Sequence, residues 1–146
     1  MNNSITRLFL PAIILWSMLS CTNKDEIIIT AFKEFPEEIK GCACYFSRTK
    51  EELYKGSYIF TDDNSEFGFI SINGKMTKLD LVGYEETDEK HWIKIFSNSQ
   101  YEITVVSQQK WQVDQMWHQT SVITIKDKKG KIVTESIHAF GECGGC

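Results

Sequence analysis

The stretch EFGFISINGKMTKLDLV, at residues 66–82, contains two alternating segments on either side of an Asn-Gly pair. Successive side chains of a strand point to opposite faces, so this alternation predicts two strands, with Phe67 and Phe69 on one face of the first. Asn73 and Gly74 both tolerate the positive φ that a two-residue hairpin turn requires. The stretch therefore predicts a β-hairpin.

Similar patterns lie on both sides of this hairpin. Strand-like alternation occurs at residues 57–61, 91–97, 101–107 and 121–140. Within the last of these, a type I turn is expected at residues 127–130, with Gly130 in the left-handed conformation. Seven or eight short strands joined by tight turns predict an all-β fold. We expect an antiparallel meander that closes to a small barrel, with a β-sandwich as the alternative.

Two segments depart from the strand pattern. Thr49 and Glu52 have the spacing of a capping box, and Gly56 provides a stop, so a helix of about two turns is expected there. Residues 21–40 are expected to form a tether and an edge strand. Pro36 interrupts their helical spacing, and three consecutive isoleucines favour a strand.

Composition limits both the class and the partners of the protein. The chain has 146 residues, with 16 Lys and Arg against 20 Asp and Glu. This acidic excess argues against binding to nucleic acid, which needs a basic face. Only two prolines occur, and no low-complexity block is present, which argues against a disordered stalk. Residues 41–146 are therefore expected to form a single β-domain.

The N-terminus has the pattern of an export signal. Arg7 is the only charge in the first twenty residues, and an apolar run follows at residues 8–19. A helix of that length reaches only about 18 Å, against about 30 Å for a bilayer core, so it is too short to span a membrane. A secretory signal peptide is predicted at residues 1–20.

The end of this segment, MLSC at residues 18–21, resembles the lipobox of bacterial lipoproteins. The resemblance implies cleavage before Cys21, acylation of that cysteine with palmitate, and a lipid anchor in the membrane. An ordinary secreted protein cut near Cys21 is the alternative. Residues 24–26, KDE, resemble the short signal that carries some Bacteroidetes lipoproteins to the outer face of the outer membrane. A position on the bacterial outer membrane is expected, at its periplasmic side or at the cell surface.

The four remaining cysteines form a CxC pair and a CxxC pair near the two ends of the domain. They are Cys42, Cys44, Cys143 and Cys146. Cysteines of exported proteins usually form disulfides. If the first and last strands are antiparallel neighbours, Cys44 meets Cys143 and Cys42 meets Cys146. The alternative is a metal-binding protein of the envelope, in which four thiolates hold zinc or copper(I).

The segment QQKWQVDQMWHQT, at residues 108–120, offers a candidate binding surface. Trp111 and Trp117 are six residues apart, so they face the same side if the strand is continuous. Tryptophans flanked by amides suit stacking on a sugar ring or anchoring a protein partner. The alternative is that both fill the core.

No motif for catalysis or for a cofactor is recognised. The sequence lacks GxSxG, a glycine-rich phosphate loop and the HExxH spacing. The acidic segment YEETDEK, at residues 84–90, is expected to be a solvated loop, since it lacks the pattern of a dedicated calcium site. We therefore expect no cofactor and no enzymatic activity.

Two broader resemblances follow from these features. The segments GCACYFS, INGK, KLDL and GECGGC resemble those of short uncharacterised bacterial envelope proteins with an early CxC and a Cys-Gly-rich end. In size, export signal and strand pattern the chain is also similar to the lysozyme-inhibitor lipoproteins, although no inhibitory residue of that family can be carried over. Together these features predict a lipid-anchored β-domain that binds an unknown protein or glycan.

Overall fold

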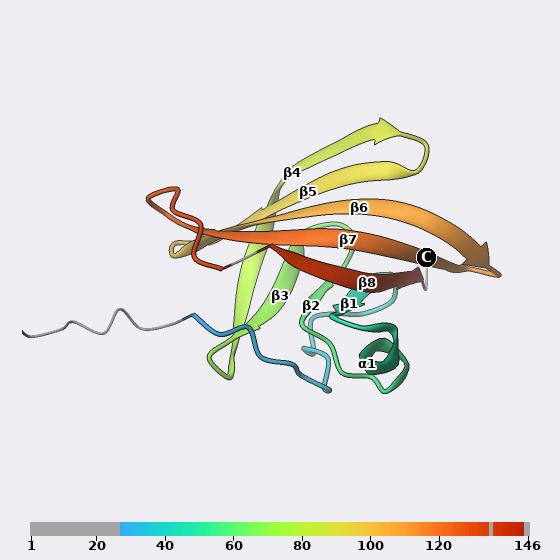
Figure 1. Ribbon diagram of the computed structural model, residues 1–146, viewed down its shortest axis with the longest axis horizontal. Coiled ribbons are helices and arrows are strands. Elements are labelled where there is room, and N and C mark those ends of the chain that lie inside the picture. Colours follow the sequence, from blue (N-terminus) through green and yellow to red (C-terminus); the bar gives the residue numbers. More distant parts are fainter. Residues whose placement is uncertain (1–26, 135, 145–146) are drawn as a thin grey trace, which may run out of the picture.

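Eight antiparallel strands follow one another in chain order around a closed barrel (Figure 1). The computed structural model describes residues 27–134 and 136–144. The predicted signal peptide, the lipidated Cys21, the KDE segment and Cys146 lie outside these residues. The all-β barrel that the sequence predicted is confirmed, and the sandwich alternative is not.

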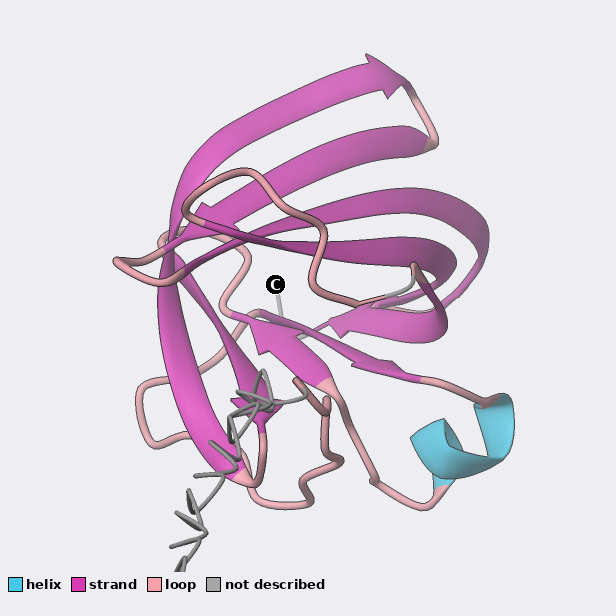
Figure 2. Cartoon of the chain, turned by 60° about the vertical axis from the view of Figure 1, so that its left-hand side comes forward, coloured by secondary structure: helices cyan, strands magenta, loops and turns pink. Residues whose placement is uncertain are grey.

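The elements are one short helix and eight strands of unequal length. They are β1 (Ala43–Ser47), α1 (Lys50–Tyr54), β2 (Phe60–Asp62), β3 (Phe67–Ile72), β4 (Lys75–Asp88), β5 (His91–Ser97), β6 (Tyr101–Val113), β7 (Met116–Asp127) and β8 (Ile137–Gly144). Figure 2 shows the strands curving around the interior, with α1 outside the barrel wall. No helix among the described residues is long and apolar enough to cross a membrane.

The turns form where the sequence predicts them. Asn73 and Gly74 join β3 to β4 with φ values of 51° and 78°. Gly130 has a φ of 78°, and its amide donates to the Asp127 carbonyl at 2.9 Å. The Thr49 side chain accepts from the Glu52 amide, and the Glu52 side chain accepts from the Thr49 amide, so the capping box is confirmed.

The barrel closes through its first and last strands. β1 pairs with β8 so that Cys44 lies opposite Cys143. These two cysteines form a disulfide across 99 residues of sequence, as predicted. Cys42 is also disulfide-bonded, and Cys146, its expected partner, lies outside the described residues. Because the bridge joins the two strands that close the barrel, it restrains the unfolded chain far more than a local link would.

Three segments differ from the sequence prediction. The acidic stretch at residues 84–90 is not a loop, because its first five residues extend β4 to Asp88. Residues 108–120 are not one continuous strand, because the chain turns at Asp114, with a φ of 52°, and returns as β7. Residues 131–134, which were expected to be part of a strand, lie outside β8 and pair with β7 through an isolated bridge from Ile132 to Lys126.

The segment before β1 packs against the barrel and contributes Ile29 to the hydrophobic core cluster. It makes isolated antiparallel bridges from Ile29 to Ile72 and from Phe32 to Tyr58. Phe35 stacks on Tyr58 with ring centroids 5.0 Å apart. The expected edge strand is thus reduced to two single bridges, because Pro36 cannot donate a ladder hydrogen bond and the chain then turns towards β1.

The barrel interior is apolar at one end and polar at the other. Aromatic and aliphatic side chains fill the apolar end, among them Phe46, Phe60, Ile70, Leu79, Phe96, Ile103, Ile123 and Ile125. Beyond them, towards the far ends of the long strands, lie the buried polar residues Asp62, Lys94, Ser107, Gln119 and Ser121. Buried polar groups require hydrogen-bond partners, so this end has a specific network rather than an apolar filling.

Candidate functional site

The polar end of the barrel opens into a pocket of about 330 Å³. We call it the mouth pocket. Its lining comprises three aromatic residues, two amides, a lysine, a disulfide-bonded cysteine and three acids: Tyr84, Trp92, Trp117, Asn64, Gln109, Lys94, Cys143, Glu86, Asp88 and Glu89. The pocket exists because β4 to β7 extend beyond the short strands β1 to β3 (Figure 1).

The floor of the mouth pocket is a buried ion pair. The Lys94 side chain is 4% exposed, and its Nζ donates to Asp62 Oδ1 at 2.8 Å and to Asn64 Oδ1 at 2.7 Å. Burial raises the pKa of Asp62, and the Lys94 charge beside it only partly offsets this effect. The floor therefore combines a fixed cationic donor with a carboxylate that has little access to water.

The floor retains unused hydrogen-bonding capacity. Asp62 Oδ2 is buried and has no hydrogen-bond partner among the described residues. The third neighbour of Lys94 Nζ is Cys44 Sγ, at 3.9 Å, and sulfur is a weak acceptor. An oxygen of a ligand is a better acceptor than this sulfur, so a ligand that reaches the floor gains a charge-assisted hydrogen bond there.

Aromatic rings form the walls. Tyr84 lies opposite Lys94 in the β4–β5 register, and Trp92 lies opposite Glu86. Trp117 lies opposite Cys143 in the β7–β8 register and packs against the core with part of its surface. Directly paired residues share a face of the sheet, so all of these side chains face the barrel interior.

The rim is acidic. Glu86, Asp88 and Glu89 are exposed and lie at the tip of the β4–β5 hairpin. The Tyr84 hydroxyl donates to Glu86 Oε1 at 2.5 Å. Partial burial, together with the hydrogen bond and the charge of Glu86, raises the pKa of Tyr84 to about 12. Tyr84 therefore stays neutral near neutral pH and holds Glu86 at the pocket.

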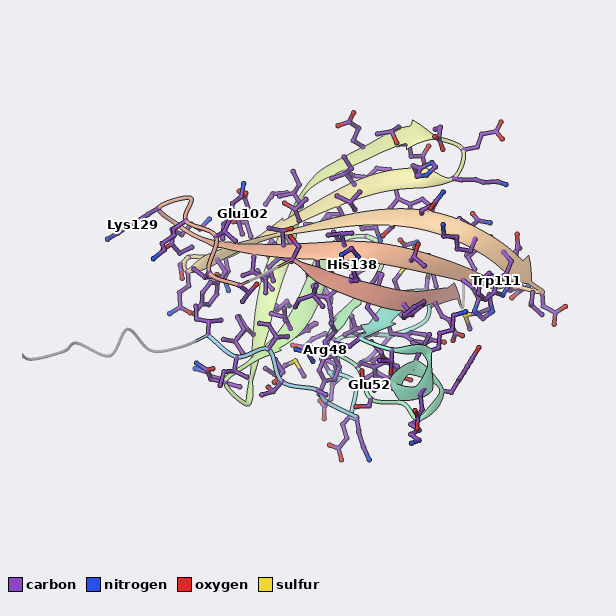
Figure 3. The ribbon with its side chains drawn as sticks, in the orientation of Figure 1. Arg48, Glu52, Glu102, Trp111, Lys129 and His138 are labelled. Atoms are coloured by element: carbon purple, nitrogen blue, oxygen red, sulfur yellow. A yellow bond between two sulfur atoms is a disulfide. The ribbon has the colours of Figure 1, made fainter. Side chains whose placement is uncertain are left out.

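The two tryptophans singled out from the sequence do not share a side. Trp111 pairs with His118, whereas Trp117 is the next residue on β7 and points to the opposite face. Trp111 lies on the outer wall, where its ring stacks on His118 at 4.8 Å and Lys50 Nζ lies 5.4 Å from its centroid. Figure 3 shows Trp111 at the end of the molecule opposite Lys129. Only Trp117 belongs to the mouth pocket.

The cysteines bear on the alternative metal site. A tetrathiolate site needs four free thiolates, and Cys44 and Cys143 are bonded to each other. Among residues 27–134 and 136–144, no group of three or more His, Cys, Asp or Glu is placed to hold a metal ion. This geometry gives the thiolate alternative no support in the oxidised protein.

Sequence reasoning identified Trp117 but missed Trp92, Tyr84 and Lys94. The sequence does contain one indication of Lys94. Alternation along residues 91–97 places Lys94 on the same face as Trp92 and Phe96, opposite Ile93 and Ile95. A lysine on the apolar face of a strand requires a buried partner. Asp62 is 32 residues away in the sequence, and only the closed barrel brings the two together.

No family model, no curated protein and no solved structure matches this chain.

Proposed function

We propose that the protein is an exported, lipid-anchored barrel that binds a glycan in its mouth pocket without catalysing a reaction. The observation that carries this proposal is a small concave site with aromatic walls, a charged hydrogen-bonding floor and an acidic rim. The lipid on Cys21 would fix the barrel to the outer membrane, and the pocket would face away from the anchor's tether.

The shape of the site favours a glycan over a protein. Small-ligand pockets are concave, begin at about 300 Å³ and combine apolar walls with a few placed polar groups. The mouth pocket, at about 330 Å³, is of this kind. Stable protein interfaces instead need about 800 Å² from each partner. A sugar ring presents an apolar face for Trp92 and Trp117 and hydroxyls for the polar floor.

An array of neutral, amino and acidic oligosaccharides tests the proposal. We expect the wild-type protein to retain a restricted set of sugars, and Trp92→Ala and Trp117→Ala to weaken that binding about tenfold, which corresponds to about 1.4 kcal/mol. Trp111→Ala is the matched control, since it removes a tryptophan of the outer wall. Circular dichroism checks that each variant is folded.

Two outcomes of the array contradict the proposal. One is that the wild-type protein retains no sugar. The other is that Trp111→Ala weakens binding as much as Trp117→Ala does, since that would place the sugar on the outer wall.

A further inference from the structure

The charge of the mouth pocket is unbalanced. Three carboxylates, Glu86, Asp88 and Glu89, line the rim, and one cation, Lys94, lines the floor. Asp88 already contacts His91 Nδ1 at 2.7 Å, so the negative charge of the rim comes mainly from Glu86 and Glu89. Asp62 already pairs with Lys94 at 2.8 Å, so the Lys94 charge is compensated inside the barrel. The rim is therefore negative, and it disfavours acidic sugars and favours a cationic group.

The distance between the rim and the floor, measured along the strands, matches the size of one sugar ring. Lys94 lies opposite Tyr84, and Glu86 is two residues further along β4. At 3.4 Å per residue, this places Glu86 about 7 Å from the floor along the strand. One sugar ring with its substituents spans such a distance. Hydroxyls at one end of the ring then reach Lys94, while a group at the other end reaches the acids.

We propose that the ligand of the mouth pocket is an amino sugar with a free, protonated amine. This inference rests on the proposed glycan-binding function and names the class of sugar. A sugar hydroxyl accepts a hydrogen bond from Lys94 Nζ and displaces the weak contact to Cys44 Sγ, which is 3.9 Å long. Other hydroxyls lie beside the side-chain amides of Asn64 and Gln109, which also line the pocket. The ammonium group lies among the rim carboxylates.

Binding of three matched disaccharides to the full-length lipidated protein in detergent tests this inference. The probes are the β-1,4 disaccharide of glucosamine, its N,N′-diacetyl form and cellobiose. They share a linkage and differ at one position of each ring, which carries an ammonium group, a neutral acetamide or a neutral hydroxyl. Isothermal titration calorimetry gives the three Kd values at low ionic strength and in about 1 M salt, where the screening length falls to about 3 Å.

We expect the glucosamine disaccharide to bind at least tenfold more tightly than cellobiose at low salt, and this ratio to fall towards one in high salt. Glu86→Gln should lower the ratio several-fold. Glu85→Gln is the matched control, because Glu85 pairs with Ile93 on the outer face of the same strand and removes an equal charge. It should leave the ratio unchanged.

Different results would overturn the preference for an amine and the proposed glycan binding. If cellobiose or the acetylated disaccharide binds as tightly as the free amine, glycan binding stands and the amine preference is wrong. A ratio that Glu85→Gln lowers as much as Glu86→Gln does also overturns it, since the effect would then come from the general charge of the protein. If none of the three disaccharides binds, the amino-sugar inference is wrong, and the array decides whether another sugar does.

Discussion

Lys94 Nζ lies 2.8 Å from Asp62 Oδ1 inside the barrel, with the two side chains 4% and 0% exposed. The pair lies where the apolar interior ends and the mouth pocket begins. Hydrophobic residues of similar volume often replace a buried ion pair without loss of stability. We infer that the pair is kept for the polar floor that it gives to the pocket rather than for stability.

Replacing one member of the ion pair should destabilise the fold more than replacing both members with apolar residues. Asp62→Leu or Lys94→Met alone leaves a buried charge without its partner and should lower the free energy of unfolding by about 3–5 kcal/mol. The double variant Asp62→Leu with Lys94→Met should lose less than either single variant. Urea denaturation of the three proteins measures this. A double variant that loses the sum of both single effects would show that the two residues act independently.

The two disulfides should stabilise the fold largely through the same restraint on the unfolded chain. A bridge that closes about 100 residues contributes up to about 4.7 kcal/mol in the chain-entropy model. Cys44–Cys143 has this separation, and the second bridge, at Cys42, starts two residues away. Replacing Cys44 and Cys143 by alanine should therefore lower stability by only about 1–2 kcal/mol, whereas reducing every bridge should lower it by several times as much. Denaturation with and without reductant compares the two. Equal losses would mean that the bridge at Cys42 contributes nothing.

The turn between β2 and β3 should make stability depend on pH. Partial burial of Asp63 favours its neutral form, but amide hydrogen bonds from Phe67, Glu66 and Ser65 outweigh this and lower its pKa. The folded protein then holds a carboxylate more strongly than the unfolded chain does. This stabilisation is complete above the ordinary pKa of 3.8 and is lost as the pH falls through the lower folded value.

Asp63→Asn tests that dependence. The variant keeps an oxygen acceptor but loses the charge, so its free energy of unfolding at pH 7 should fall by up to about 1 kcal/mol, given the solvent around the site. The difference from the wild type should shrink below about pH 4, where the wild-type carboxyl of the unfolded chain is largely protonated. Ser65→Ala, which removes one hydroxyl donor, should show a weaker dependence. A difference that stays constant down to pH 2 would contradict the assignment.

The anchor is tested by Cys21→Ser. The wild-type protein should incorporate labelled palmitate and sediment with the outer membrane, since a diacylated cysteine gives stable binding to a bilayer. The variant should do neither, while still forming the disulfide between Cys44 and Cys143. Incorporation of palmitate by the variant, or a wild-type protein released into the medium without lipid, would contradict the lipoprotein assignment.

Local signals in the sequence predicted much of the fold. The Asn73–Gly74 turn, the turn ending at Gly130 and the capping box at Thr49 each depend on residues close together in the chain. The pairing of Cys44 with Cys143 was also predictable, because the four cysteines near the two ends of the β-domain were expected to pair in an exported protein.

The remaining features depend on contacts between distant residues. The turn at Asp114 was missed because its partner, Gln115, is not a strong turn former, and the flanking residues read as one strand. Residues 84–88 were expected to be a loop because their strand projects beyond the core and shows no apolar alternation. The mouth pocket gathers side chains from five strands and two turns, and no spacing within one segment encodes that arrangement.

The location of the binding site is tested most directly by amide chemical shifts of the labelled protein, titrated with cellobiose and with the glucosamine disaccharide. We expect shifts that cluster at Tyr84, Trp92, Lys94 and Trp117, together with the side-chain indole signals of Trp92 and Trp117, and no change at Trp111 or Val106 on the outer wall. Shifts confined to the outer wall would contradict binding in the mouth pocket, and no shifts with either sugar at millimolar concentration would contradict the amino-sugar inference.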